Sequence, residues 1–325
     1  MSEVKFSIIV PAYNAERYLE KCLKSLLNQD LPLDEYEIIV INDGSIDRTG
    51  EILDDYSKHF SNLYHLMIEN SGVSVARNYG CEKAVGKYFL FVDADDWIKA
   101  NVLRKIYETL EKDVLDVLVM DYCYWECDKE IPKTFNFIPE NKSLDTEVFS
   151  GLYFMQEFLP QVVWSSAYRA TFWKEHNLSF LPIRHEDEEI IPRIFFYAKR
   201  VKILPLKFYN YQKNPDSFMM NYSDNACFYM IQAMESLDIF RQKNVRDNRL
   251  DAYLRNLITE RLFAAFLRGV QFGVSTKSLY EMILLMKEKN LALLPKRKGF
   301  LHAFLYYHLP FLFIVYYRLK KKRKM

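Results

Sequence analysis

The feature that most constrains the fold is the stretch Tyr-Phe-Leu-Phe-Val-Asp-Ala-Asp-Asp-Trp at residues 88–97. Five residues suited to a buried strand lead directly into three carboxylates, Asp93, Asp95 and Asp96. A continuous apolar run of this length is typical of an inner strand in a sheet covered on both faces. Carboxylates at the end of such a strand lie in the crevice where open α/β sheets bind ligands. The stretch therefore predicts an α/β fold with a ligand site at this strand end.

The carboxylates also predict a metal site. Asp93 and Asp95 are two positions apart, so in extended backbone their side chains share a face. Two close carboxylates repel each other unless a cation lies between them, and such oxygen ligands suit Mg²⁺ or Mn²⁺, usually completed by a diphosphate. The alternative is a strand end followed by a solvated acidic turn, because this spacing alone is common.

Alternating strands and helices surround this stretch. Strands are expected at residues 5–10, 37–41, 63–68 and 88–93. Asn14 is the expected N-cap of the first helix and Asp47 that of the second. The alternation predicts a parallel, doubly wound sheet, and right-handed crossovers place every strand-end loop on one edge. We therefore expect Asp43, Arg77 and Asp93 to converge.

The later part of the chain is more helical. A helix at 99–112, a strand region at 114–125 and a hairpin or insertion at 126–150 precede the acidic cluster at 185–189. A helix at 190–198 is expected to hold Pro192 in its first turn, which places the carboxylates at its start, facing out of the core. Periodicity after the strand at 201–211 predicts helices at 224–243, 248–272 and 276–289. We predict three domains, at residues 1–217, 218–294 and 295–325.

Five stretches together resemble the family-two inverting glycosyltransferases of the GT-A fold. In chain order they are Ile9–Asn14, Val40–Thr49, Gly72–Asn78, Val92–Trp97 and Glu186-Asp187. Each motif is weak alone, and their number and order carry the resemblance over residues 5–217. It implies a Rossmann-like, mostly parallel sheet flanked by helices, here followed by a helical C-terminal subdomain. Later residues share only a general likeness to bacterial polysaccharide-assembly members.

The resemblance implies a nucleotide-diphosphate-sugar donor, usually a UDP-sugar. Pro11, Ala12 and Tyr13 would border the nucleotide, although Tyr13 could equally be core packing. Asp43 would accept a hydrogen bond from the uracil ring, and its alternative is the first residue of an Asp-Gly turn. Arg77 would lie near the nucleotide, and its alternative is a pair with a surface carboxylate.

The resemblance also implies metal and base residues. Asp93, with Ala94 beside it, would reach the ribose or the metal, and Asp95 would bind Mn²⁺ or Mg²⁺. Asp187 would be the base, with Glu186 as its close competitor. A positioned carboxylate suits this role because the incoming sugar hydroxyl is a poor nucleophile and must lose its proton as it attacks. One of the neighbouring carboxylates, including Glu188, could instead only cap the helix.

Three further side chains have open roles. His185 adjoins the acidic cluster and is either near the metal or a structural histidine. Trp97 and Trp164 are either acceptor-side platforms, because aromatic faces suit sugar rings, or core tryptophans.

The last thirty residues combine apolar and basic character. No Asp or Glu follows Glu288, whereas ten Lys and Arg residues do, so the net charge of +1 conceals an acidic body. The aromatic-rich run at 300–317 lies between basic clusters at 296–298 and 318–324. We expect residues 296–325 to meet an anionic membrane surface as an interfacial anchor. The alternative is a buried terminal helix with a solvated basic end. Nucleic acid is not expected as a partner.

The favoured function is transfer of a sugar to a hydroxyl of a saccharide acceptor, lipid-linked, in cell-surface polysaccharide synthesis. The expected location is the cytoplasmic face of a bacterial plasma membrane, as a peripheral or monotopic protein. Five cysteines without a C-x-x-C pair favour reduced thiols. The alternatives are a nucleotidyltransferase, a D-x-D phosphatase, or a non-catalytic membrane-bound partner. Trp97 stands where the phosphatase pattern requires Thr or Val, and the loop after the first strand lacks the glycines of a nucleotidyltransferase.

Overall fold

The computed structural model describes residues 3–127, 129–131, 146–214, 226–291, 302, 305–306 and 308–322. The chain forms two compact units. The first comprises Met1–Pro182 with Ile190–Asn214, and the second comprises Ile183–Glu189 with Pro215–Met325. The three-domain division expected from the sequence stays a prediction.

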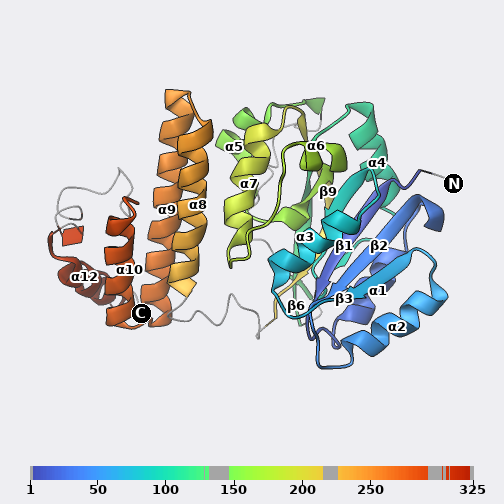
Figure 1. Cartoon of the computed structure of the whole chain (residues 1–325), viewed down its shortest axis with the longest axis horizontal. Helices are drawn as coiled ribbons and strands as arrows, with labels where there is room; N and C mark the ends of the chain where they lie inside the picture. The colour runs from blue at the N-terminus through green and yellow to red at the C-terminus, as the bar shows by residue number, and fades with distance from the viewer. Residues whose placement is uncertain are drawn as a thin grey trace. The chain divides into compact units, whose positions relative to one another are not determined.

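The first unit begins with the predicted strand–helix alternation. Its elements are β1 (Phe6–Ala12), α1 (Leu19–Leu27), β2 (Tyr36–Asn42), α2 (Thr49–His59), β3 (Leu63–Met67), α3 (Val73–Lys83) and β4 (Tyr88–Phe91). The strands are parallel and lie in the order β3-β2-β1-β4. The order reverses after β3, so right-handed crossovers place α1 and α2 on one face of the sheet and α3 on the other (Figure 1).

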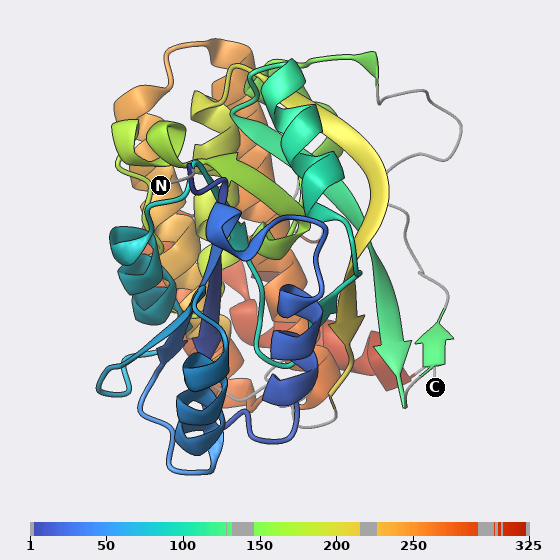
Figure 2. The same cartoon turned by 90° about the vertical axis from the view of Figure 1, so that its right-hand side faces the viewer.

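Beyond β4 the sheet becomes mixed. The next elements are β5 (Trp97–Ile98), α4 (Leu103–Lys112), β6 (Val117–Glu126), β7 (Lys129–Ile131), α5 (Gly151–Phe158), β8 (Ser166–Arg169), α6 (Ala170–Glu175), α7 (Glu186–Tyr197) and β9 (Val201–Gln212), with single 3-10 turns at Leu33–Glu35 and Val163–Ser165. The order continues β4-β8-β6-β9-β5, and β8 is antiparallel to both of its neighbours. The long strands β6 and β9 run parallel, side by side (Figure 2). The α/β fold with helices on the sheet is confirmed.

Burial explains why the central strands form. All seven residues of β2 and all four of β4 are buried, as expected for apolar runs inside a covered sheet. Helix α3 packs very closely on β1 at Gly80. A Cβ at this position would lie 2.5 Å from Cγ2 of Ile9, so only glycine fits. This contact holds α3, which carries Arg77, against β1.

The second unit is helical, as predicted. Its helices are α8 (Ala226–Asn244), α9 (Asn248–Phe272), α10 (Thr276–Glu288) and α12 (Pro310–Lys322). The Asp247 carboxylate caps α9 by accepting hydrogen bonds from the backbone N–H groups of Arg249 and Leu250. Gly273 ends that helix with φ of 81°, a left-handed conformation that glycine adopts without strain.

Four local expectations are wrong. Asn14 does not cap α1, which begins at Leu19; its side chain accepts from the backbone N–H of Ile46 instead. The helix expected from residue 99 begins at Leu103, because residues 97–98 pair with β9. Pro192 lies inside α7, which starts four residues earlier than expected. Asp47 lies one residue before the N-cap of α2, which is Arg48, although its carboxylate does accept from the backbone N–H of Thr49.

The terminal helix is buried on one side and exposed on the other. Phe313, Ile314 and Tyr317 lie in the core of the second unit, against α9 and α10. Phe311 and Leu319 are each 57% exposed. In the part of the chain described, no helix combines the length and apolar character needed to cross a bilayer. The basic cluster at 296–298 and much of the run at 300–309 lie outside the described residues.

Candidate active site

The D-x-D stretch forms a tight turn at the carboxyl end of β4. The backbone N–H of Asp96 donates to the carbonyl of Asp93 at 3.0 Å. The extended backbone expected to place Asp93 and Asp95 on one strand face is therefore wrong, because the strand ends at Phe91. The turn still brings the two carboxylates close enough that the charge of Asp93 raises the pKa of Asp95.

Asp96 is the structural member of this turn. Its carboxylate accepts from the Tyr209 hydroxyl at 2.7 Å and from the backbone N–H of Gln212 at 2.7 Å. It is 1% exposed. Burial, reinforced by the charges of Asp95 and Asp93, raises the pKa of Asp96 well above its ordinary value. Asp96 thus ties the turn to β9.

Asp95, the neighbour of this anchor in the chain, is half-buried. The amide Nδ2 of Asn214 donates to Oδ2 of Asp95 at 2.6 Å. Burial, followed by the charge of Asp93, raises the pKa of Asp95 from 3.8 to about 6. This elevation identifies a carboxylate whose negative charge is incompletely compensated, which is a recurrent property of functional sites.

Arg77 supplies the positive charge of the site. The residue is buried in the first turns of α3, and its Nη2 donates to Oδ1 of Asp93 at 2.7 Å. The Arg77 guanidinium also lies over the Phe180 ring, 5.4 Å from its centroid. The predicted convergence of Arg77 with Asp93 is confirmed, and the alternative of an exposed surface pair is excluded by burial.

Asp43 organises the approach to α3. Its two carboxylate oxygens accept from the backbone N–H groups of Ser71 and Gly72, each at 2.8 Å. Its own N–H donates to the carbonyl of Ala12 at 2.8 Å. Asp43 thus joins the ends of β1 and β2 to the loop before α3. A carboxylate has about four lone-pair sites, so this geometry leaves capacity for a ligand N–H.

The loops after β1 and β2 are cross-linked by hydrogen bonds. The N–H of Asn14 donates to the Ser45 hydroxyl at 2.9 Å, and that of Ala15 donates to the Thr49 hydroxyl at 2.8 Å. Glu16 and Asp47 extend the same network. These hydrogen bonds fix the loops at the edge of the sheet where we expect the nucleotide to bind.

The residues expected to border the nucleotide differ in exposure. Ala12 is buried and Pro11 is partly buried, whereas Tyr13 is 53% exposed. Tyr13 is therefore not core packing. Ala94, in the turn between the two metal-ligand candidates, is 6% exposed. These assignments to the nucleotide stay predictions.

The acidic cluster occupies the first turn of α7 and belongs to the second unit. Glu188 pairs with Nε of Arg261 at 2.9 Å, and the buried Glu189 accepts from the Ser236 hydroxyl at 2.9 Å. The expectation that the whole cluster faces out of the core is therefore wrong for Glu189. Burial and the charges of Arg268 and Arg184 lower the pKa of His185 to about 4. A neutral, half-buried histidine fits the structural role. Asp187 and Glu186 remain the candidates for the base.

Sequence reasoning missed the contribution of β9. Tyr209, Gln212 and Asn214 hold two of the three carboxylates at the end of β4. The available signal was that the strand predicted at 201–211 ends in amide side chains, as strand ends at a ligand crevice commonly do. The pairing of β5 with β9, which brings these segments together, has no local sequence signature.

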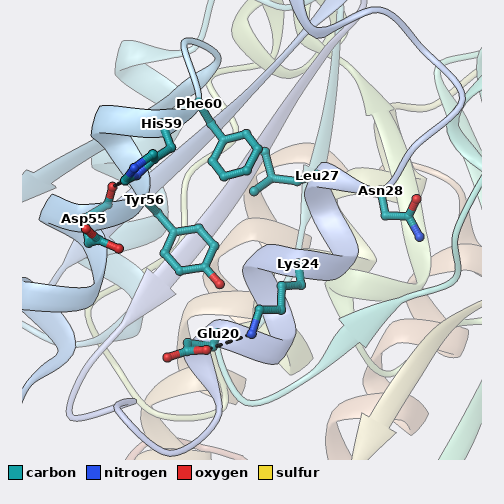
Figure 3. Close-up of a pocket in the computed structure, with 8 residues that line it drawn as sticks. All are labelled: Glu20, Lys24, Leu27, Asn28, Asp55, Tyr56, His59 and Phe60. Carbon is teal, nitrogen blue, oxygen red and sulfur yellow. Dashed lines mark hydrogen bonds and ion pairs between the residues drawn. The ribbon is translucent and has the colours of Figure 1, made fainter.

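A separate hollow of about 490 Å³ lies between the outer faces of α1 and α2 (Figure 3). Eight residues line it: Glu20, Lys24, Leu27, Asn28, Asp55, Tyr56, His59 and Phe60. None of the residues predicted for the site is among them.

The carboxylates fit a metal that is shared with a ligand. Among the described residues, no group of three or more His, Cys, Asp or Glu side chains is arranged to hold an ion. Asp93 and Asp95 are a pair, and Mg²⁺ or Mn²⁺ sites commonly use one or two carboxylates with substrate phosphates completing the shell. The charge conflict between the two carboxylates is what such a cation would relieve.

The fold and this arrangement define a class of protein. Residues 7–156 match Glycosyl transferase family 2, so this part of the chain is a domain of that family. The resemblance seen in the sequence is thus confirmed.

Individual relatives can then be named. EpsH of Bacillus subtilis, named as a glycosyltransferase, is 29% identical over 264 residues, covering 78% of this chain and 73% of EpsH. EpsJ of the same organism, also named as a glycosyltransferase, is 35% identical over 215 residues, covering 65% of this chain and 62% of EpsJ.

Solved structures share the fold. TarS of S. aureus (residues 1–349, in complex with UDP-GlcNAc) superposes with a TM-score of 0.71 at 22% identity, covering 97% of this chain and 89% of TarS. The mannosyltransferase PcManGT from Pyrobaculum calidifontis, in complex with GDP-Man and Mn²⁺, gives 0.54 at 13% identity, covering 98% and 86%. At these identities the likeness concerns the fold alone.

Proposed function

We propose that this protein transfers a sugar from a nucleotide-diphosphate donor to a hydroxyl of a saccharide acceptor, with inversion at the anomeric carbon. The observation that carries the proposal is the junction of Arg77, Asp93 and Asp95 at the end of β4, beside the cross-linked loops after β1 and β2. A UDP-sugar is the favoured donor. The TarS structure, which contains UDP-GlcNAc, supports this choice.

We assign the nucleotide to the edge formed by Pro11, Ala12, Tyr13 and Asp43. Asp43 retains lone pairs for the uracil N–H while its backbone contacts fix its orientation. The exposed ring of Tyr13 is available to cover the base. Arg77 orients Asp93 through their ion pair, so that Asp93 faces the ribose or the metal.

The diphosphate is assigned to the turn at Asp93-Ala94-Asp95. Mn²⁺ or Mg²⁺, when bound there, would neutralise the negative charge that develops on the leaving diphosphate. The hydrogen bond from Asn214 already fixes the Asp95 side chain, so ligand binding requires little further ordering of it. The Mn²⁺ in the mannosyltransferase structure supports a metal in this fold.

We assign the general base to Asp187, with Glu186 as the alternative. Both carboxylates lie in the first turn of α7, and they are the two residues of the cluster that match the Glu-Asp motif of the resemblance. The base takes the proton of the acceptor hydroxyl as its oxygen attacks the anomeric carbon. One displacement then forms the new glycosidic bond and releases the nucleoside diphosphate, without a covalent enzyme intermediate.

We further propose that the acceptor is lipid-linked and that the enzyme works at the cytoplasmic face of a bacterial membrane, in polysaccharide synthesis. The exposed Phe311, Leu312 and Leu319 of α12 and the basic residues that follow them support contact with anionic lipid. The bacterial relatives support the setting.

A screen of sugar nucleotides with and without Mn²⁺, read by thermal unfolding and by release of nucleoside diphosphate, tests the proposal. Ligand that binds the native state raises the unfolding temperature. We expect metal-dependent stabilisation by at least one UDP-sugar. Stabilisation by nucleoside triphosphates with release of pyrophosphate would favour a nucleotidyltransferase, and binding without turnover would favour a non-catalytic partner.

A further inference from the structure

Four tyrosines line one face of the sheet beside the D-x-D turn. The parallel register of β6 and β9 places Tyr122 opposite Tyr209 and Tyr124 opposite Tyr211. Because side chains alternate along a strand, these four share one face. Together with Trp164, which packs on them, they form what we call the aromatic stripe.

Trp164 packs against three of the four tyrosines. Its ring stacks on Tyr209 at 4.3 Å and 11° and on Tyr211 at 5.7 Å and 14°, while Tyr122 meets it edge-on at 4.7 Å. Trp164 is 5% exposed. The acceptor-platform hypothesis for Trp164 itself is therefore wrong, because its faces pack against the tyrosines. Trp97 lies outside the stripe, with Nζ of Lys21 only 3.2 Å from its ring centroid.

Tyr211 and Tyr124 form the half-buried end of the stripe. Their rings meet edge-on at 5.6 Å, and Nζ of Lys213 lies 5.7 Å from the Tyr124 centroid. These contacts hold the two rings in place while part of their surface stays accessible.

The stripe lies next to the carboxylates, because the Tyr209 hydroxyl donates to Asp96 and the strand then continues through Tyr211. The chain continues from Tyr211 to Gln212, which binds Asp96, and then to Asn214, which binds Asp95. Burial, and then the charges of Asp96, Asp95 and Asp93, raises the pKa of Tyr211.

The strand order places the nucleotide edge and the aromatic stripe on opposite sides of the turn that carries the carboxylates. The order β2-β1-β4-β8-β6-β9 puts the nucleotide edge, at β1 and β2, on one side of the turn after β4. The aromatic stripe on β6 and β9 lies on the other side. With the donor diphosphate at the turn, the stripe lies beyond the transferred sugar, where the acceptor must approach.

We propose that Tyr211 and Tyr124 bind the acceptor by stacking on a pyranose ring, so that the acceptor terminus is a ring sugar rather than an open polyol chain. A pyranoside in the β-gluco configuration presents one face made only of axial C–H bonds, which is apolar and matches an aromatic face. A polyol chain such as ribitol has no such face. This inference rests on the proposed glycosyl transfer and specifies its acceptor.

Saturation-transfer NMR tests the proposal with two probes, methyl β-D-glucopyranoside and ribitol, each in the presence of UDP and Mn²⁺. We expect transfer to the axial protons of the glucoside and little transfer to ribitol. Tyr211→Leu should weaken glucoside binding by about tenfold, the scale of one lost aromatic contact. Tyr211→Phe should bind it as the wild type does. Tyr64→Leu is the matched control, because Tyr64 is 53% exposed on β3 at the far edge of the sheet.

UDP affinity, measured on the same samples, separates the outcomes. Unchanged UDP binding with weakened glucoside binding in Tyr211→Leu supports the proposal. Equal glucoside binding in Tyr211→Leu and Tyr64→Leu overturns the proposal. Saturation transfer to ribitol as strong as that to the glucoside also overturns it. Weakened UDP binding in a folded Tyr211→Leu would assign Tyr211 to the donor site, and this outcome would also overturn the proposal. If Tyr211→Leu does not fold, Tyr124→Leu takes its place against the same criteria. Failure of the wild type to bind any nucleotide would instead refute the proposed function.

Discussion

Asp95→Asn should stabilise the protein at neutral pH, although it removes a proposed metal ligand. In the folded state burial and the neighbouring Asp93 raise the pKa of Asp95 from 3.8 to about 6. One pKa unit corresponds to about 1.36 kcal/mol, so the ionised Asp95 costs the folded state about 3 kcal/mol. An asparagine of the same shape carries no charge and its oxygen can still accept from Asn214.

The sign of the pH dependence follows from the direction of the shift. A raised pKa means that the folded state binds the proton more tightly than the unfolded state. The stability that the protonated Asp95 provides is complete below pH 3.8 and is lost as the pH rises through about 6. The advantage of Asp95→Asn over the wild type should therefore grow from about 1 kcal/mol at pH 4.5 to about 3 kcal/mol at pH 8.

Urea unfolding of both proteins across this pH range measures the effect. Asp55→Asn is the matched control, since Asp55 is an exposed carboxylate on α2. Mn²⁺ with UDP should stabilise the wild type but not Asp95→Asn. Adding both should therefore reduce the difference in free energy of unfolding between the two proteins. A difference between the two proteins that is the same at pH 4.5 and pH 8 would refute the reasoning, because it would show that Asp95 is neither desolvated nor in conflict with Asp93.

Three other variants test the remaining assignments. Asp187→Asn should retain donor binding and lose transfer by about 10²–10⁴-fold, measured by product formation, whereas a larger loss in the conservative Glu186→Gln would reassign the base. Arg77→Met should destabilise the fold by about 3 kcal/mol in urea unfolding, because it leaves Asp93 without its cation. The double variant Arg77→Met with Asp93→Asn should recover much of this lost stability. If the double variant recovers none of it, the two residues do not form a direct ion pair. Phe311→Ser with Leu319→Ser should reduce co-sedimentation with anionic vesicles without altering the unfolding temperature, since both side chains are mostly exposed, and Phe313→Ser, in the core, is the contrasting variant that should unfold α12.

Apolar runs predicted the central sheet well because their burial leaves few alternatives. The strands at 37–41 and 63–68 and the helix at 248–272 correspond closely to β2, β3 and α9. The antiparallel β8 is only four residues long and depends on both neighbouring strands, so no local pattern indicates it. The turn at Asp93 was missed for the same reason: Asp96 is held by Gln212, 116 positions away.

The sequence predicted the charged residues of the site better than the residues that hold them in place. Arg77 and Asp93 were expected together, because right-handed crossovers bring strand-end loops to one edge. The amide of Asn214 and the hydroxyl of Tyr209 could not be expected, since their contacts depend on where β9 enters the sheet. The missing N–H of Pro192 predicts a position in the first turn of a helix, yet Pro192 lies inside α7 and the helix continues through it.

The cross-linked loops after β1 and β2 have a kinetic consequence. Their backbone N–H groups are already bound to Ser45, Thr49, Asp47 and Glu16 before any nucleotide arrives. Such an edge does not need to fold around its ligand, so little conformational entropy is lost on binding. Association of the nucleotide should then be a single fast phase whose rate rises linearly with concentration, without the plateau that a slow rearrangement of the protein would impose.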